Sequence, residues 1–458
     1  MIFFEKTTKI KAFLLQAKLS ERTCRYLLSL VAGFLCHWGR MTASQAGQAI
    51  VTAARHRGNI GRFLAESGES VNWLESPRTA LLRLEPESRR GGTWLFLLDQ
   101  TQCSQQGSKT ENTYSTGNRQ RRPRKGRRYS PRKLARKTVH AFVLGLLITP
   151  SGLRLPFSRC YYSKEYCLQK NLLHRTQSEL GAELIAELQV PPNARVIVLG
   201  DTAYDAKVIR AACAKRNYTW IVPVNPERVL AGPKPRPKIR AMVLGMKPDQ
   251  FVPVRLHPNK GRFVAQRRLS KHRIGPKVKS RTFYVHAETR EVHSVGMAQL
   301  VFSCKEIPSQ DKPIPLSKIL MTNDTKLTAA EVVELYSLRW QIELFIKEIK
   351  GTLGMHQYRF RKFEKVAAWV QAALLAFLFL EWTRARKLRA RRLSPEEKRR
   401  WQSQRTHGLC RAIRHEAEAK ELEELARLAK TKTGLKKLRK LLYAAQPPEY
   451  RASPKKRG

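Results

Sequence analysis

The segment Thr328–Lys350, which reads TAAEVVELYSLRWQIELFIKEIK, constrains the fold most strongly because its apolar residues recur with a helical period. Thr328 and Glu331 have the spacing of a capping box, and Gly351 follows where a helix is expected to stop. No glycine or proline interrupts the segment, so we predict one continuous helix. At about 100° per residue, its core-facing stripe consists of Leu335, Leu338, Ile342, Phe345, Ile346 and Ile349.

A second stripe of the same helix is polar and lies within about 80° of arc. It combines one carboxylate with a phenol and three cations: Tyr336, Arg339, Glu343, Lys347 and Lys350. The carboxylate of Glu343 is a ligand that a divalent metal prefers, and the cations and the phenol are groups that bind phosphate. The alternative is an ordinary surface helix with spaced Glu/Lys pairs, and the helix alone does not decide between them.

The net charge of the chain limits the kinds of molecule that it is expected to bind. The 458 residues contain 88 Lys and Arg against 36 Asp and Glu, which gives a net charge of +52. A hydrophobic fraction of 42% is sufficient for packed domains, and the length allows roughly two to four of them. Such an excess of positive charge favours a polyanion as partner, so we expect nucleic acid before an anionic membrane surface.

The sequence predicts a cytoplasmic protein without a membrane partner. Its N-terminus, MIFFEKTTKIKAFLLQ, lacks the layout of a signal peptide. The apolar run Val366–Leu380 is short and bounded by charges, so we expect a buried helix there. The eight cysteines are scattered, with no CxxC pair and no histidine pair at finger spacing, which favours reduced thiols over a zinc site.

Residues 1–90 are expected to form a helical N-terminal DNA-binding domain. Thr42 precedes the run SQAGQAIVTAAR, the turn His56–Asn59 follows, and IGRFLAESG continues with helical spacing. Two helices joined by a glycine-containing turn, with arginines nearby, are compatible with a helix-turn-helix. Plain helical hairpins have the same pattern, so the signal is weak.

Residues 91–224 alternate apolar and amphipathic runs in the manner of an α/β core. TWLFLLD is expected to be a buried strand that ends at Asp99, and RVIVLG is expected to be another that ends at Asp201. The other expected elements are strands at Thr138–Ile148 and Leu153–Tyr162 around a turn at Thr149–Gly152, helices at Asn171–Leu188 and Ala206–Arg216, and a strand at Thr219–Val224.

This order is that of the ribonuclease-H-like fold: three strands, a helix, a strand and then further helices. In that fold a chain reversal places the first and fourth strands side by side, which would bring Asp99 next to Asp201. A helix packed on the sheet would then add Glu343. A single aspartate at a strand end is usually a cap or a hydrogen-bonded residue, but two of them followed by a glutamate in this order favour a shared site.

Three carboxylates suit Mg²⁺, or Mn²⁺ in its place, because both ions prefer oxygen ligands. Two such ions about 3.5–4 Å apart activate a nucleophilic oxygen and stabilise the leaving oxygen of a phosphodiester. That chemistry serves attack by water and by a 3′-hydroxyl, without a covalent protein intermediate. Asp99, Asp201 and Glu343 are therefore the candidate catalytic and metal-binding residues.

Residues 225–327 are expected to form a β-rich insertion subdomain, because they are too many for a plain loop. Their β-type runs are Phe251–His257, Arg262–Leu269, Arg281–Ala287, Gln299–Lys305 and Ser317–Met321. Residues 328–383 would then complete the ribonuclease-H-like core with the catalytic helix.

Two further segments are basic enough to contact a DNA backbone. Arg119–Lys137, RQRRPRKGRRYSPRKLARK, lies between the first two expected strands and is expected to be a loop that contacts phosphates. Residues 384–458 are expected to form a basic helical C-terminal region, either a DNA-binding arm or a surface for protein contacts. A solvated arm is the alternative for the first segment.

These motifs resemble those of bacterial cut-and-paste DDE transposases of the insertion-sequence family numbered four, which carry a Y-R-E-K signature. The members of that signature are separated by two, three and six residues, as are Tyr336, Arg339, Glu343 and Lys350. Asp201-Thr202-Ala203-Tyr204 is similar to the family's second-aspartate motif, and Asp99 on its apolar strand is similar to the first aspartate. The resemblance extends from about Trp94 to Leu380.

The resemblance implies a transposase that cuts the ends of its mobile element and joins them to target DNA. Asp99, Asp201 and Glu343 would bind two Mg²⁺ ions, and the cations and tyrosine of the signature would hold phosphates near the cut. It implies a bacterial, nucleoid-associated protein that acts on double-stranded DNA, both terminal inverted repeats and target, as a homodimer in a synaptic complex. Two alternatives stay open: a Mg²⁺-dependent nuclease without strand transfer, and a catalytically silent DNA-binding protein descended from a transposase.

Overall fold

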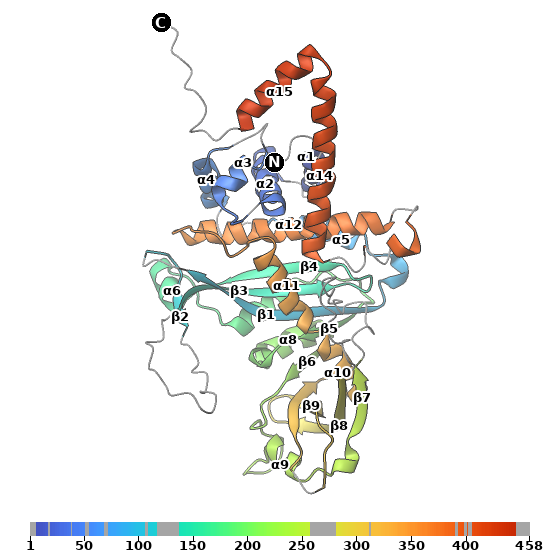
Figure 1. The fold of residues 1–458 in the computed structure, drawn as a ribbon. Helices are drawn as coiled ribbons and strands as arrows, with labels where there is room; N and C mark the ends of the chain where they lie inside the picture. The colour runs from blue at the N-terminus through green and yellow to red at the C-terminus, as the bar shows by residue number, and fades with distance from the viewer. Residues whose placement is uncertain are drawn as a thin grey trace, which may run out of the picture. The chain divides into compact units, whose positions relative to one another are not determined.

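The computed structural model describes residues 6–16, 19–37, 39–50, 55–67, 72–105, 109–116, 137–256, 281–310, 313–389, 393–397, 401 and 405–445. The chain is a mixed α/β protein that divides into two compact units (Figure 1). The first unit comprises Met1–Leu84, Gln105–Glu111 and Lys347–Gly458, and the second comprises Glu85–Ser104 and Asn112–Ile346. The expected division into five domains stays a prediction.

Among the described residues, ten strands form one mixed sheet in the order β2-β3-β1-β5-β6-β10-β9-β8-β7, with β4 paired to β3. The strands are β1 (Thr93–Gln105), β2 (Tyr114–Thr116), β3 (Lys137–Ile148), β4 (Arg154–Tyr161), β5 (Arg195–Leu199), β6 (Thr219–Pro223), β7 (Val252–Leu256), β8 (Arg281–Val292), β9 (Gly296–Cys304) and β10 (Leu316–Thr322). If the short β2 is left out of the count, β1 and β5 are the first and fourth strands of the core. They are neighbours and run parallel, as predicted. This arrangement is consistent with a ribonuclease-H-like core.

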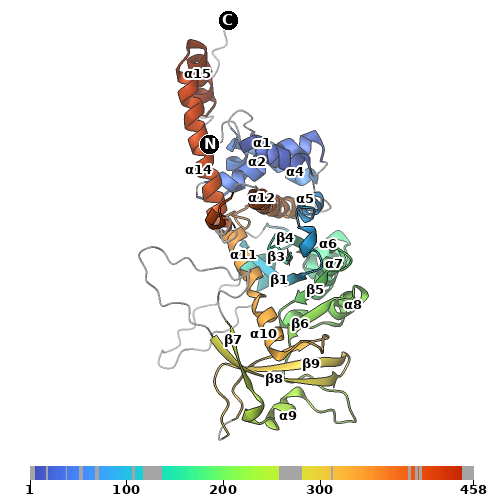
Figure 2. The ribbon, with the colours of Figure 1, turned by 90° about the vertical axis from the view of Figure 1, so that its right-hand side faces the viewer.

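Successive residues of β1 and β5 are buried on both faces of the sheet, which explains why these strands are apolar runs rather than alternating strands. α7 (Gln177–Ala186) and α8 (Lys207–Lys215) lie on one face, and α10 (Ala329–Ser337) with the start of α11 (Trp340–Gly351) lies on the other (Figure 2). α10 packs against β6, β8, β9 and β10. The remaining helices of this unit are α6 (Lys164–Lys170), α9 (Ile239–Leu244) and the short 3-10 turns η2 (Glu87–Arg89), η3 (Thr202–Tyr204) and η4 (Pro248–Gln250).

The helix predicted at Asn171–Leu188 begins later than expected, and side-chain caps are the reason. Thr176 and Glu179 form a capping box that starts α7 at Gln177. Asn171 instead ends α6, a helix that was not predicted, in the left-handed conformation at φ 52°. The predicted turn at Thr149–Gly152 is confirmed, and Glu85 holds it through the hydroxyl of Thr149 at 2.6 Å.

The described strands of residues 225–327 extend the core sheet. β10 pairs antiparallel with β6, from Leu320 opposite Pro223 to Thr322 opposite Ile221, and β9, β8 and β7 follow in order. Strands were predicted at four of these places, and the structure has them with shifted ends. The fifth expected run, Arg262–Leu269, and nearly all of the basic segment Arg119–Lys137 lie outside the described residues.

The first unit is helical and is built around α12 (Phe363–Arg389), the buried helix that the sequence predicted. α12 packs against α1 (Lys6–Leu15), α2 (Glu21–Cys36), α4 (Arg57–Ser67), α5 (Glu75–Leu82) and α14 (Thr406–Ala429). Aromatic contacts join them, with ring centroids 4.9 Å apart for Phe34 and Trp369. Among the described helices α12 alone is long and apolar enough to span a membrane, but 83% of its most apolar stretch is buried, as in a core helix.

The expected helix-turn-helix at the N-terminus differs in its boundaries. Thr42 caps α3 (Ala43–Gln48) through a capping box with Gln45, but α3 ends earlier than predicted. α4 already begins at Arg57, inside the expected turn. Arg55 lies over the ring of Tyr26, 4.5 Å from its centroid, so it is packed within the unit. A role of this region in DNA binding stays a prediction.

Candidate active site

Asp99 lies on β1, and Asp201 lies two residues beyond the end of β5, the parallel strand next to β1. β1 and β5 pair from Thr93 opposite Arg195 to Leu97 opposite Leu199, and the same register continued by two residues places Asp99 opposite Asp201. Both aspartates are half-buried. The topology therefore brings together two carboxylates that are about a hundred residues apart in the sequence, as predicted.

The prediction that β1 ends at Asp99 is wrong, because the strand continues to Gln105. Beyond Asp99 the burial alternates, with Thr101 and Cys103 buried and Gln102 and Ser104 exposed. One face of the strand is thus solvated there, and its sequence is polar at every second position. The apolar run marks only the part of β1 that is covered on both faces.

The carboxylate of Asp201 is held by the turn that follows β5. It caps η3 by accepting a hydrogen bond from the backbone N–H of Ala203 at 2.9 Å. Tyr204, which ends this turn, is 1% exposed. A Cβ on Gly200 would lie 2.7 Å from the Cβ of Tyr204, and one on Gly181 would lie 2.9 Å from its ring, so both glycines are needed for this packing.

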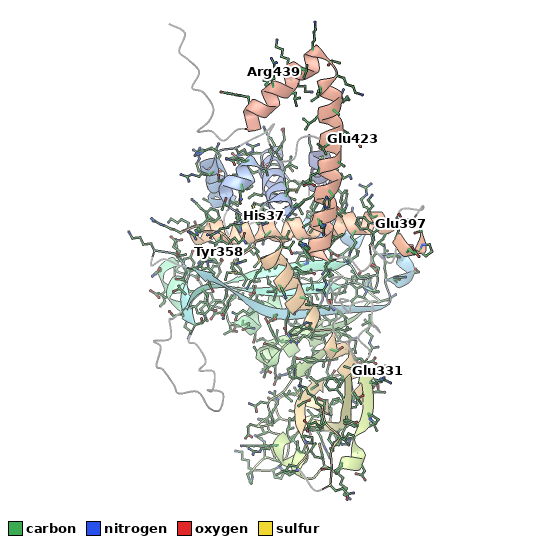
Figure 3. All side chains as sticks on the ribbon, in the orientation of Figure 1. His37, Glu331, Tyr358, Glu397, Glu423 and Arg439 are labelled. Carbon is green, nitrogen blue, oxygen red and sulfur yellow. The ribbon has the colours of Figure 1, made fainter. Side chains whose placement is uncertain are left out.

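The start of the expected catalytic helix is confirmed. Thr328 and Glu331 form the predicted capping box: the N–H of Glu331 donates to the Thr328 hydroxyl at 3.2 Å, and the N–H of Thr328 donates to the Glu331 carboxylate at 2.8 Å. Glu331 is labelled at the start of α10 in Figure 3.

The prediction of one continuous helix from Thr328 to Lys350 is wrong, because the chain breaks into α10 and α11 at Leu338 and Arg339. Around the break the N–H groups of Leu338, Arg339 and Ile342 bond to carbonyls three residues back instead of four. The chain is therefore wound more tightly at the break than in an α-helix. Ile342, Phe345 and Ile349 are fully buried as predicted, whereas the stripe does not continue unchanged into α10: Val332 and Val333 are buried there and Leu335 is only half-buried.

Next to this break, Arg339 forms an ion pair with Glu343 and lies close to the ring of Tyr336. Arg339 Nη2 lies 2.5 Å from Glu343 Oε1, and its guanidinium lies 5.9 Å from the centroid of the Tyr336 ring. The Arg339 and Glu343 side chains are 15% and 30% exposed, and Tyr336 is 8% exposed. These three members of the predicted polar stripe therefore form a partly buried cluster rather than a solvated helix surface.

The pKa of Asp99 shows that the carboxylates influence one another. Burial, followed by the charge of Asp201, raises this pKa to about 6, and Glu343 adds to the rise. Arg339 and a 2.8 Å hydrogen bond from the N–H of Gln100 oppose it. Three acids thus share a region in which their negative charges are only partly compensated, and a bound cation would relieve that repulsion.

Two family comparisons cover these residues. Residues 174–379, which include Asp201 and Glu343, match the family described as "Transposase DDE domain". Residues 14–267, which include Asp99 and Asp201 and exceed half of the chain, match the family described as "DDE superfamily endonuclease". The chain belongs to the DDE superfamily of endonucleases. No curated protein matches the chain significantly.

Membership in the DDE superfamily confirms the broad prediction of a DDE-type transposase or nuclease that acts on DNA. Enzymes of this superfamily generally use divalent metals. The narrower assignment to the insertion-sequence family numbered four, with its Y-R-E-K signature, stays a prediction.

The donor set of the endonuclease fits a hard divalent metal in type, but the three acids do not form a finished metal site. Among the described residues no three His, Cys, Asp or Glu side chains are grouped closely enough to hold an ion. Glu343 is engaged with Arg339 instead. Asp99 and Asp201 are the residues that would hold the metal first, and Glu343 would join them by turning away from Arg339.

Lys347 and Lys350 follow Glu343 on α11, but from Lys347 onward this helix belongs to the first unit. Lys347 is exposed and Lys350 is half-buried. Their predicted contact with DNA phosphates stays a prediction.

The sequence analysis did not identify Asp205, whose side chain stabilises the turn that follows Asp201. Its carboxylate binds Arg210 of α8 at 2.7 Å and Arg228 at 2.6 Å. The three side chains are 8%, 13% and 20% exposed. Burial raises the pKa of Asp205, and the two arginines oppose that rise. Because Asp205 directly follows Tyr204, this cluster fixes the turn relative to α8 and to the segment that enters the insertion.

The second missed residue is Lys318 on β10, inside the run that was predicted only as an apolar strand. Its Nζ lies 4.8 Å from the centroid of the Tyr336 ring. Burial, then the charges of Arg339 and Lys305, lower the pKa of Lys318, whereas Glu343 and Asp201 oppose the shift. The available signal was a single lysine within SKILM, a run whose other residues suit a buried strand.

The raised pKa of Asp99 predicts a pH-dependent stability of the metal-free endonuclease. A carboxyl whose pKa rises on folding from 3.8 to about 6 stabilises the fold below pH 4, and that contribution is lost as the pH rises through about 6. D99N should therefore raise the melting temperature by about 2–4 °C at pH 7.5 and by about half as much at pH 5, because the loss of this contribution starts near pH 4. Thermal unfolding in EDTA measures both; a lower melting temperature at pH 7.5 would contradict the assignment of a repelled charge.

Proposed function

We propose that this protein is a transposase that cleaves the ends of its mobile element and transfers the freed strands into target DNA. The supporting observation is that the charges of Asp201 and Glu343 both raise the pKa of Asp99, which lies on β1 beside the parallel strand β5 that leads to Asp201. Catalytically useful carboxylates need such a partly buried, mutually repelling arrangement, which favours bound cations. The superfamily matches cover the same three residues.

In this proposal Asp99, Asp201 and Glu343 hold two Mg²⁺ ions, for which Mn²⁺ can substitute. The ions supply activation of a water or 3′-hydroxyl oxygen and stabilisation of the leaving oxygen. Arg339 has two roles: it pairs with Glu343 in the structure, and its guanidinium becomes available for a bidentate contact to phosphate once Glu343 turns to the metals. Tyr336 holds Arg339 in place, and Lys347 and Lys350 contact phosphates further along the DNA.

The proposed partners are double-stranded terminal inverted repeats and target DNA. The net charge of +52 favours phosphate contacts over most of the chain. The C-terminal helix α15 (Lys432–Ala445) carries several basic side chains and no acidic one, and Figure 3 labels one of them, Arg439. We infer a homodimer that brings two ends together in a synaptic complex, in the cytoplasm of a bacterium and associated with its nucleoid.

A strand-transfer assay tests this function against its alternatives. The substrate is a labelled duplex that carries the short inverted repeats expected to flank the reading frame, and the target is a supercoiled plasmid with Mg²⁺. A transposase yields cleaved ends and ends joined to the plasmid. Cleaved ends without joined products would favour a nuclease, and neither product would favour a silent DNA-binding protein.

A further inference from the structure

A β-bulge sets the direction of Lys318. The pairing of β9 with β10 changes register between Leu316, which faces Cys304, and Lys318, which faces Ser303, so that Ser317 is an extra residue. Bulges beside functional sites commonly re-aim a side chain.

Two serine hydroxyls stabilise this bulge. The Ser317 hydroxyl donates to the carbonyl of Ser303 at 2.8 Å, and the Ser303 hydroxyl donates to the carbonyl of Lys318 at 3.1 Å. The backbone on both sides of the extra residue is therefore fixed by side chains, and the position of Lys318 is a built feature of the insertion.

The bulge brings a second cation to the aromatic ring of the active-site cluster. Lys318 Nζ lies 4.8 Å and the Arg339 guanidinium 5.9 Å from the centroid of the Tyr336 ring. Lys305, the residue after β9, adds a further positive charge that acts on Lys318. Arg339 has Glu343 as its ion-pair partner, and this small region would become more positive when Glu343 turns to a metal.

A cation–π contact alone explains why Lys318 lies near Tyr336, but it does not explain why three cations gather beside an acidic site. An anion between them would lower their mutual repulsion, and a phosphodiester carries one negative charge on oxygens that both ammonium and guanidinium groups bind. The contact therefore suits a phosphate that lies next to the carboxylates.

We propose that Lys318, together with Tyr336 and Arg339, forms a subsite for one DNA backbone phosphate beside the cleavage point, so that the β-rich insertion contributes directly to substrate binding. The inference rests on the proposed function for the identity of the DNA. It assigns to β10 a phosphate beside the cleavage point, whereas Lys347 and Lys350 of α11 are proposed to contact phosphates further along the DNA.

Three substitutions test the subsite. K318M keeps an apolar stem over the Tyr336 ring and removes the charge, K318R restores the charge, and K247M removes an exposed charge elsewhere in the insertion. Fluorescence anisotropy of end DNA in EDTA, measured over a series of KCl concentrations, gives affinity and salt dependence. K318M should weaken binding by about 5- to 10-fold and lower the salt slope by about one, K318R should restore both, and K247M should match the wild type.

Phosphate ethylation interference identifies which DNA phosphate binds at the Lys318 subsite. Ethylation of one phosphate beside the cleavage point should impair binding by the wild type and have no further effect on K318M. A wild-type salt slope in K318M overturns the subsite, as does a K318M protein that loses thermal stability without any change of slope. Mg²⁺-dependent cleavage by the wild-type protein tests the proposed function separately. If the wild type cleaves end DNA and K318M has the wild-type salt slope, only the subsite is refuted. If the wild type does not cleave and K318M has a reduced salt slope, only the proposed transposase activity is refuted.

Discussion

Replacing Glu343 with glutamine is expected to lower the rate of metal-dependent cleavage of end DNA by at least about 10³-fold. A neutral amide is a poor ligand for Mg²⁺, and the substitution also removes the ion-pair partner of Arg339. Single-turnover cleavage with Mg²⁺ measures the effect. Binding of end DNA in EDTA should stay within about threefold of the wild type, because the carboxylate does not attract phosphate.

E334Q is the matched control for this substitution. Glu334 is an exposed glutamate on α10, close to Glu343 in sequence but outside the cluster of Tyr336 and Arg339. Its replacement should leave the cleavage rate unchanged. Cleavage by E343Q at a rate comparable to that of E334Q would remove Glu343 from the chemistry.

Replacing Asp205 with alanine is expected to cause the largest loss of stability, about 3–5 kcal/mol in the free energy of unfolding. Asp205 is the shared partner of Arg210 and Arg228, and all three side chains are largely buried. Its removal leaves two guanidinium groups close together without their anion. The melting temperature should fall by on the order of 10 °C in thermal unfolding.

E227A is the control for Asp205, because Glu227 also binds two cations, Lys238 at 2.8 Å and Arg240 at 3.5 Å. The Glu227 side chain is 48% exposed, so its ion pairs are screened by water. Its replacement should shift the melting temperature by less than about 2 °C. Equal shifts for the two variants would show that burial does not set the strength of the Asp205 cluster.

Local signals in the sequence predicted much of the fold and the acidic part of the site. The capping box of Thr328 and Glu331 marks the start of α10, and the apolar runs before Asp99 and Asp201 mark β1 and β5. Once the order of the elements is recognised, the parallel pairing of those strands follows, and with it the approach of the two aspartates.

The features that the sequence did not predict depend on tertiary contacts. Neither glycine nor proline marks the break at Leu338 and Arg339, and Leu338 and Arg339 are themselves good helix formers. The bulge that directs Lys318 exists only through the pairing of β10 with β9. The cluster of Asp205 needs Arg228, which lies beyond the next strand and has no signal in common with it.

Metal-directed cleavage of the polypeptide tests most directly whether Asp99, Asp201 and Glu343 form one metal site. With Fe²⁺ in place of Mg²⁺, together with ascorbate and peroxide, hydroxyl radicals form at the metal and cut the backbone nearby. We expect cuts near residues 99, 201 and 343 of the full chain, all suppressed by excess Mg²⁺ and all lost together in D201N. Cuts at only one of these segments, or a pattern that D201N leaves unchanged, would contradict a single metal site formed by Asp99, Asp201 and Glu343.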